Sequence, residues 1–178
     1  MEKIEIATFG GGCFWCIEAA LNKVRGVVSA TSGYSAGHRE NPSYQQIITG
    51  TTGHAEVIQV EYDANVINYE QLLSMFFQLH DPTTLNRQGN DIGTQYRSII
   101  LYHDNAQLNT AQDLINKLNL LGIWDQSICT EIKQYEDFYP AEHYHQGYAL
   151  KNPEQPYCAI LIGPKLEEFE FKFKNWLK

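Results

Sequence analysis

The alternation of hydrophobic and polar positions predicts a sheet with helices between its strands. HAEVIQVEYD at 54–63 alternates along its whole length, which is typical of a strand. YEQLLSMFFQLH at 69–80 has apolar residues at helical spacing, and Asp81 followed by proline would end that helix. The same criteria predict strands over 3–9, 26–35, 54–63, 97–103 and 127–135, and helices over 13–24, 69–80 and 104–122.

The order of these elements indicates the fold class. The first six run strand, helix, strand, strand, helix, strand, which is the split β-α-β, ferredoxin-like pattern. We therefore expect an α+β sandwich with a mixed, mostly antiparallel sheet, to which one helix, one strand and long loops are added. No repeat interrupts the 178 residues, which predicts a single domain over 1–178. Two polar, aromatic and turn-rich segments, 82–96 and 139–157, have the character of functional loops.

Composition and charge exclude several classes of protein. Hydrophobic residues make up 43% and charged residues 19% of the chain, as in globular proteins. Thirteen Lys and Arg against 21 Asp and Glu give a net charge of −8, which argues against a nucleic-acid partner. No apolar run reaches the ~20 residues of a membrane span, and the first residues lack a signal-peptide pattern. We therefore expect a cytoplasmic protein, and nothing in the sequence requires more than a monomer.

The segment FGGGCFWC at 9–16 carries the strongest chemical signal. Its glycines lie between a predicted strand and a predicted helix, which places Cys13 at a helix N-terminus. The positive end of the helix dipole favours a thiolate, so we expect the pKa of Cys13 to lie below the ordinary value of about 8.5. Phe14 and Trp15 would form an apolar wall, and Cys16 lies on the same helix face, near enough for a disulfide.

The other cysteines and the C-x-x-C spacing permit simpler interpretations. Cys129 falls inside a predicted strand and is expected to be a small buried hydrophobic residue. C-x-x-C also occurs in thioredoxin-like dithiols, but that spacing alone is a weak signal. No second C-x-x-C completes a zinc site, so we expect no metal.

Several polar side chains in the loops could join an activated thiol. Tyr44 follows a turn, Glu56 begins a strand, and Asp91 and Tyr96 lie in RQGNDIGTQYRS at 87–98. Taken singly, each is more simply explained by packing, solvation or a turn. Together with Cys13 they suggest hydrogen-bonding groups gathered around a small polar group.

Five segments resemble one known family. They are GCFWC at 12–16, GYSAGHRENPSY at 33–44, TGHAEVIQVEYD at 52–63, HDPTTLNRQGNDIGTQYRS at 80–98 and FYPAEHYHQGY at 138–148. Together they resemble the peptide methionine sulfoxide reductase A family over about residues 6–158. The resemblance implies an α+β domain with a mixed sheet and thiol-dependent reduction of the S epimer of methionine sulfoxide, free or in oxidised proteins.

The resemblance also implies roles for individual residues. The nucleophile falls on Cys13 and the general acid on Glu56. The pocket for the substrate methyl group falls on Phe14 and Trp15, and supporting hydrogen-bond groups fall on Tyr44, Asp91 and Tyr96.

The chemistry accounts for these residue types. A thiolate can attack the positive sulfur of a sulfoxide, but the oxygen leaves poorly until it is protonated. Because a glutamate of ordinary pKa, about 4.3, is ionised at neutral pH, we expect burial among aromatic rings to keep Glu56 protonated. Tyr44 and Tyr96 would then donate hydrogen bonds to the oxygen as its charge grows.

Oxygen transfer leaves Cys13 as a sulfenic acid, which a second thiol converts to a disulfide. Cys16 is near by helix geometry, and Cys158 occupies the place where many members of the family keep a resolving cysteine. Because CAILI at 158–162 is apolar and strand-like where those members have a mobile glycine-rich tail, Cys16 is favoured, with Cys158 as the alternative. The resemblance implies thioredoxin as the external reductant, with dithiothreitol as its substitute in vitro, and no bound cofactor.

Two other functions compete with this interpretation. A general dithiol–disulfide oxidoreductase would use the C-x-x-C pair and would not need Glu56 or Tyr96. A module that binds oxidised methionine without turnover would keep its function in a Cys13→Ser variant. The element order counts against the first, and a plausible resolving thiol counts against the second.

Overall fold

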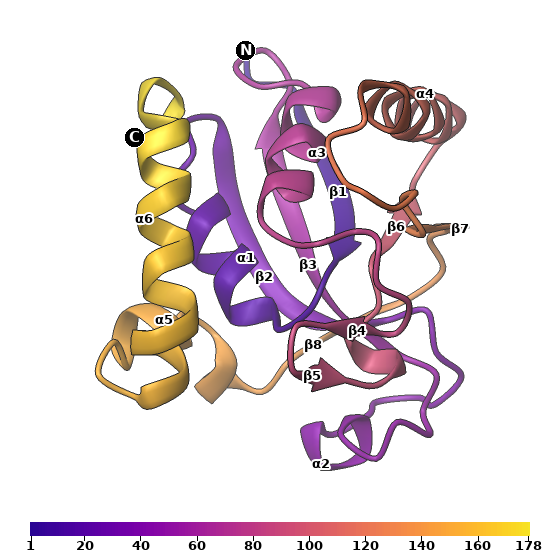
Figure 1. The fold of residues 1–178 in the computed structure, drawn as a ribbon, viewed down its shortest axis with the longest axis vertical. Coiled ribbons are helices and arrows are strands. Elements are labelled where there is room, and N and C mark those ends of the chain that lie inside the picture. Colours follow the sequence, from indigo (N-terminus) through magenta and orange to yellow (C-terminus); the bar gives the residue numbers. More distant parts are fainter.

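A curved six-stranded sheet forms the centre of the molecule in a computed structural model that describes residues 1–178 (Figure 1). Its strands are ordered β7-β6-β1-β3-β2-β8, and every neighbouring pair is antiparallel except β6 and β7. The bounds are β1 Ile4–Gly10, β2 Val27–Ser35, β3 Ala55–Asp63, β6 Ile99–Tyr102, β7 Glu131–Gln134 and β8 Phe138–Pro140. The predicted α+β class with a mixed, mostly antiparallel sheet is confirmed.

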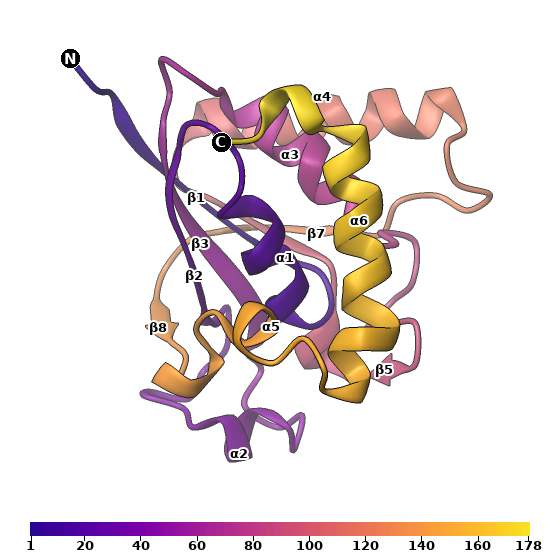
Figure 2. The same cartoon turned by 90° about the vertical axis from the view of Figure 1, so that its left-hand side faces the viewer.

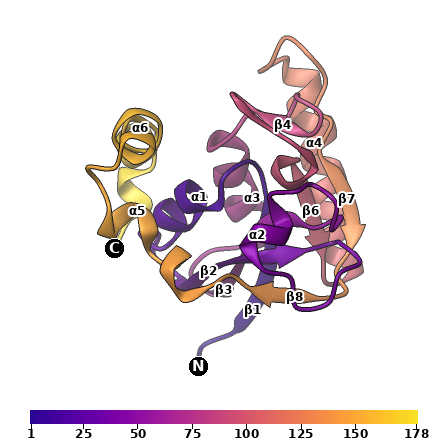
Figure 3. The same ribbon diagram turned by 90° about the horizontal axis from the view of Figure 1, so that it is seen from below.

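Helices cover one face of this sheet (Figures 2 and 3). They are α1 Phe14–Leu21, α3 Tyr69–Gln78, α4 Asn105–Leu121 and α6 Gly163–Lys172. The main core lies between these helices and the sheet, because Ile58, Val60 and Tyr62 of β3 point toward it and are fully buried. Val57 points to the opposite face and belongs to a smaller cluster with β6, as the period of two predicted.

Short elements decorate the edges of the sheet near the chemically interesting segments. Helices α2 (Tyr44–Ile47) and α5 (Tyr148–Lys151) and a small hairpin of β4 (Arg87–Gln88) and β5 (Asp91–Ile92) lie at one end of the sheet, near α1 (Figures 1 and 3). Capping boxes fix the starts of α2 and α3, and α4 ends at Gly122 in the left-handed conformation, as predicted.

Two expectations about the C-terminal half are wrong. CAILI at 158–162 is not a strand: it is a wide helical turn that continues directly into α6. Leu166 and Phe169 extend its apolar spacing along a helix that packs on α1, and this amphipathic packing outweighs the local β preference. The strand expected at 127–135 is also shorter: β7 begins at Glu131, so Cys129 lies in the preceding loop and is exposed, not buried.

Candidate active site

The glycine-rich turn from β1 into α1 is forced by close contacts. A Cβ atom on Gly10 would lie 2.2 Å from the carbonyl oxygen of Glu56, and one on Gly11 would lie 2.4 Å from the His80 ring. Gly12 has a φ of +82°, which favours glycine, and its N–H donates to the Tyr96 carbonyl at 3.1 Å. The glycines therefore let the chain pass between β3 and α3 and deliver the next residue to the start of α1.

Cys13 is that residue, and it caps the N-terminus of α1 in extended conformation. Its pKa is raised well above the ordinary value, first by burial and then by the charge of Glu56, while the Trp15 backbone N–H acts in the opposite direction. The expectation of a lowered pKa is therefore wrong for the resting enzyme. The N–H at the helix end stabilises the thiolate, but the free-energy cost of removing the thiolate from water is larger than this stabilisation.

Glu56 on β3 faces Cys13 from the sheet and is 2% exposed. The backbone N–H of Phe14 donates to its Oε1 at 3.2 Å. Burial raises its pKa to about 8, with a further rise from the charge of Asp91 and an opposing effect of the Phe14 N–H. Glu56 is therefore a protonated carboxyl group at neutral pH, as the chemistry of a general acid requires.

One cavity of about 250 Å³ brings all seven predicted reaction and methyl-pocket residues together. They are Cys13, Phe14, Trp15, Tyr44, Glu56, Asp91 and Tyr96, and Gln155 and Tyr157 complete the lining. Burial, followed by the charge of Glu56, raises the pKa of Tyr44 to about 12 and that of Tyr96 still higher. Both hydroxyl groups therefore remain protonated donors at any physiological pH.

Trp15 is held in place by side chains from the loop at 139–157. Its Nε1–H donates to Nδ1 of His145 at 3.1 Å, and its ring stacks on Tyr148 with centroids 3.9 Å apart. Because the indole nitrogen can only donate, His145 must be the neutral tautomer with its proton on Nε2, and that buried atom has no partner. The aromatic wall is thus fixed by one oriented hydrogen bond and one stack.

Two carboxylates, the buried Glu18 and the half-buried Glu142, connect that loop to the rest of the site. Glu18 of α1 accepts from the N–H of Gly147 at 2.9 and 3.0 Å, which fixes the segment that carries His145 and Tyr148. Glu142 accepts from the N–H of Tyr44 at 2.8 Å. Glu142, His145 and Tyr148 thus orient residues that line the cavity.

The family model described as peptide methionine sulfoxide reductase matches residues 5–177, almost the whole chain. The chain belongs to the peptide methionine sulfoxide reductase MsrA family. It is therefore an oxidoreductase that reduces methionine sulfoxide, and the assignment that the sequence resemblance implied is confirmed.

Individual relatives match this reductase over nearly their full lengths. It is 54% identical over 169 residues to the enzyme MsrA of Nautilia profundicola, covering 95% of each chain. It is 49% identical over 176 residues to MsrA of Saccharolobus solfataricus, covering 98% of each chain.

Solved structures show the same fold. Reduced Mxr1 from Saccharomyces cerevisiae has a TM-score of 0.79 at 36% identity, over 86% of this chain and 88% of that one. Methionine sulfoxide reductase A of Corynebacterium diphtheriae has a TM-score of 0.76 at 34% identity, over 85% and 76%. A third structure, with a TM-score of 0.56 at 26% identity over 82% and 85%, is that of yeast Mxr1 in complex with Trx2.

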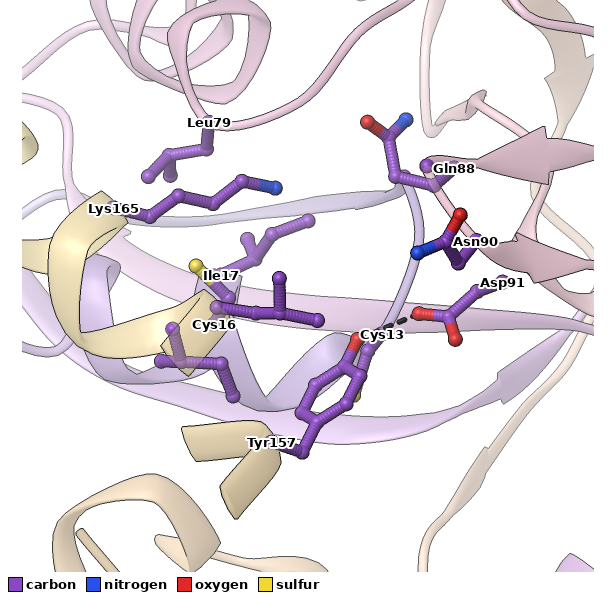
Figure 4. A pocket seen from close by; sticks show the side chains of 13 residues that line it. Cys13, Cys16, Ile17, Leu79, Gln88, Asn90, Asp91, Tyr157 and Lys165 are labelled. Atoms are coloured by element: carbon purple, nitrogen blue, oxygen red, sulfur yellow. Dashed lines mark hydrogen bonds between the residues drawn. The ribbon is translucent and has the colours of Figure 1, made fainter. Parts of the chain in front are cut away.

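The reductase has a second cavity, of about 300 Å³, on the other side of Cys13 (Figure 4). Cys13, Asp91 and Tyr157 line both cavities. The Tyr157 hydroxyl donates to the Asp91 carboxylate at 2.6 Å and lies close enough to Cys13 to lower the pKa of its thiol, and the two cavities adjoin at these residues. Sequence reasoning missed Tyr157, although its position directly before Cys158 was a usable signal.

The three remaining thiols lie in different surroundings. Cys16 lines the second cavity with Cys13, whereas Cys158 lies in a small buried cluster that also contains Cys16. Cys129 is remote from both cavities and exposed. No group of three or more His, Cys, Asp or Glu side chains is placed to hold a metal ion, and no helix is both long and apolar enough to cross a bilayer.

Proposed function

We propose that this reductase converts methionine-S-sulfoxide, free or in a peptide, to methionine in the cavity between Cys13 and Glu56. The observation that carries the proposal is the meeting of a thiol, a protonated carboxyl and two tyrosine hydroxyls beside the rings of Phe14 and Trp15. This set complements a sulfoxide, because the thiol suits its electrophilic sulfur and the donors suit its oxygen.

Glu56 acts as general acid in the first step. Its proton moves to the sulfoxide oxygen as the Cys13 sulfur attacks the substrate sulfur. Tyr44 and Tyr96 donate hydrogen bonds to the same oxygen while its charge changes, in a role of the oxyanion-hole type. Asp91 supports this arrangement through the hydrogen bond from Tyr157.

The raised pKa of Cys13 fits a coupled exchange of two protons. The thiol releases its proton as it attacks, and the Glu56 carboxylate formed by the first transfer accepts it. The bond between the two sulfur atoms then breaks as the hydroxyl group passes from the substrate sulfur to the Cys13 sulfur, which leaves Cys13 as a sulfenic acid, the substrate as methionine and Glu56 protonated again. The acid therefore needs no proton from solvent during the step.

The fixed aromatic wall supports selection of the S epimer. With the oxygen held by three donors and the sulfur by Cys13, the methyl group of only one epimer would face Phe14 and Trp15. The other epimer would direct its methyl group toward polar side chains or its longer substituent into the rings.

A second thiol then completes the chemistry. We propose Cys16 as the resolving thiol, with Cys158 as the alternative, because Cys16 and Cys13 share the second cavity. Thioredoxin, or dithiothreitol in vitro, reduces the resulting disulfide, which the complex of the related yeast enzyme with Trx2 supports. Thioredoxin would supply these electrons in the cytoplasm.

The fold and assembly complete the proposal. The central order β6-β1-β3-β2, with α1 and α3 as the connecting helices, supports a ferredoxin-like unit to which β7 and β8 are added at the edges. We propose that residues 1–178 form a single catalytic domain that works as a monomer.

An assay on separated epimers tests this function. With dithiothreitol as reductant, the enzyme should convert the S epimer and leave the R epimer unchanged, and Cys13→Ser should abolish conversion. Equal conversion of both epimers, or reduction of protein disulfides at a higher rate than sulfoxide, would refute the proposal.

A further inference from the structure

The second cavity contains one charged side chain with no assigned function. Lys165 reaches into it from α6, and Figure 4 shows its ammonium group directed inward over the side chains of α1. Cys16 lines the same cavity from α1, and Cys13 lies at its far wall. A cation, a resolving thiol and the reactive sulfur therefore line one cavity.

Lys165 has no carboxylate partner. The three ion pairs of the structure join Lys3 to Glu5, Lys23 to Glu170 and Arg97 to Glu131, and none involves Lys165. Lys165 is exposed overall, so water screens part of its charge, but no carboxylate partner reduces its effect on an anion that forms nearby.

No other ionisable group around Lys165 forms an ion pair with it, although the Asp91 side chain lines the same cavity and Glu168 lines a smaller one beside Lys165. Asp91 lies across the cavity and accepts a hydrogen bond from Tyr157, whose pKa is raised first by burial. His80, behind Gly11, has its pKa lowered to about 4 by burial and is neutral at physiological pH. Cys158, in the cluster behind Cys16, is a thiol whose pKa burial raises.

Cys16 itself needs help to ionise. Burial raises its pKa to about 11, and the charge of Lys165 acts in the opposite direction. Because the thiolate attacks and the thiol does not, a buried resolving cysteine reacts slowly unless a cation stabilises its charge.

We propose that Lys165 promotes the resolving step by stabilising the Cys16 thiolate as it attacks the sulfenic acid of Cys13. The inference rests on the proposed function and deepens it, because it assigns the second cavity to regeneration of the enzyme. Lys165 acts through Cys16 and does not contact the substrate.

The step is balanced in atoms and electrons. The Cys16 thiolate forms a bond to the Cys13 sulfur, the S–OH bond breaks, and hydroxide leaves and takes up the proton that Cys16 released, giving water. Cys16 is oxidised from thiol to disulfide, and the Cys13 sulfur is reduced from sulfenic acid to disulfide.

A single-turnover experiment separates this step from the first. Reduced enzyme is mixed with excess methionine-S-sulfoxide without reductant, and methionine release, trapping of sulfenic acid by dimedone and loss of free thiols are followed between pH 6 and 9. Lys165→Met, Lys165→Gln and Lys165→Arg are compared with wild type, and Lys172→Met, on the same helix but outside this cavity, is the matched control.

We expect methionine release to be unchanged in every variant and disulfide formation to slow in Lys165→Met and Lys165→Gln. Each pKa unit added to Cys16 lowers the thiolate fraction tenfold, and its higher nucleophilicity recovers part of this, so the net loss is about three- to fourfold per unit at pH 7. Between pH 6 and 9 the rate of disulfide formation should rise with pH in every variant and should be lower at each pH in both neutral variants, and Lys165→Arg should restore it.

Three results would overturn the inference. The first is an unchanged rate and pH profile of disulfide formation in both neutral variants. The second is an equal slowing in Lys172→Met, and the third is a Cys13–Cys158 bond in wild-type enzyme after one turnover. If wild-type enzyme released no methionine, the proposed function itself would fail. Methionine release is measured separately from thiol loss, so the two failures can be distinguished.

Discussion

Glu56→Gln should make the protein more stable while it removes most of the activity. Folding raises the pKa of Glu56 from 4.5 to about 8 by burial. Below pH 4.5 both the folded and unfolded states hold the proton, and the group costs nothing. As the pH rises toward 8 the unfolded state ionises while the folded state stays protonated, so the free energy of unfolding falls.

The expected size follows from that shift. The loss is about 1.4 kcal/mol per pH unit, so at pH 7, about 2.5 units above 4.5, wild type loses about 3 kcal/mol that a glutamine does not lose. The difference should level off above pH 8. The amide oxygen of the introduced glutamine can still accept from the Phe14 N–H, so the cavity keeps its geometry. Loss of the acid should slow methionine release by about 10²–10⁴-fold.

Urea unfolding at pH 5, 6, 7 and 8 measures the stability, and single-turnover methionine release measures the activity. Glu142→Gln is a control with the opposite expected sign. Burial raises the pKa of Glu142, but donors such as the Tyr44 N–H outweigh burial and lower this pKa overall. Replacing the Glu142 carboxylate should therefore destabilise the protein at neutral pH. A Glu56→Gln advantage that is independent of pH, or undiminished turnover, would refute the reasoning.

Three further predictions concern Cys13, its surroundings and the other thiols. Gly11→Ala should lower the free energy of unfolding by about 1–3 kcal/mol, because its Cβ would lie 2.4 Å from the ring of His80. The control is Gly163→Ala, whose Cβ would make ordinary contact. Equal urea midpoints for the two variants would contradict this prediction. Iodoacetamide should label exposed Cys129 before the buried Cys16 and Cys158, and Cys129→Ser should leave activity unchanged; prior labelling of either buried thiol, found by peptide mass mapping, would disprove the packing described. Tyr157→Phe removes a hydroxyl group whose proton can turn from Asp91 to the Cys13 thiolate and so lower the pKa of Cys13. Alkylation of Cys13 should therefore require a higher pH in Tyr157→Phe, whereas Tyr148→Phe should show no such change; identical alkylation profiles for Tyr157→Phe and wild type would contradict this role.

The main elements of the fold were predictable because their signals are local. The alternation of β3 and the helical spacing of α3 each place apolar side chains on the face that packs into the core. Capping residues mark where helices start. The C-terminal segment was not predictable in this way. CAILI has β-branched and apolar residues in a short run, and only its packing against α1 makes it helical.

The site was predictable in its members and less so in its electrostatics. A resemblance could identify Cys13 and Glu56, and a chemical reason could be given for a raised carboxyl pKa. The same burial acts on the thiol, however, and the sequence showed only the helix N-terminus that acts against it. Tyr157 was missed because its contact with Asp91 joins residues 66 positions apart.

Because two cavities adjoin at Cys13, Asp91 and Tyr157, one sulfur atom can be approached from two directions. If the substrate binds in the cavity lined by Glu56 and regeneration uses the cavity lined by Lys165, as we propose, the two halves of the cycle do not compete for volume. A small molecule bound in the cavity lined by Lys165 would let each enzyme molecule reduce one sulfoxide and would then hold Cys13 as the sulfenic acid. A molecule lodged among the aromatic rings would block repair and leave the regenerating machinery untouched.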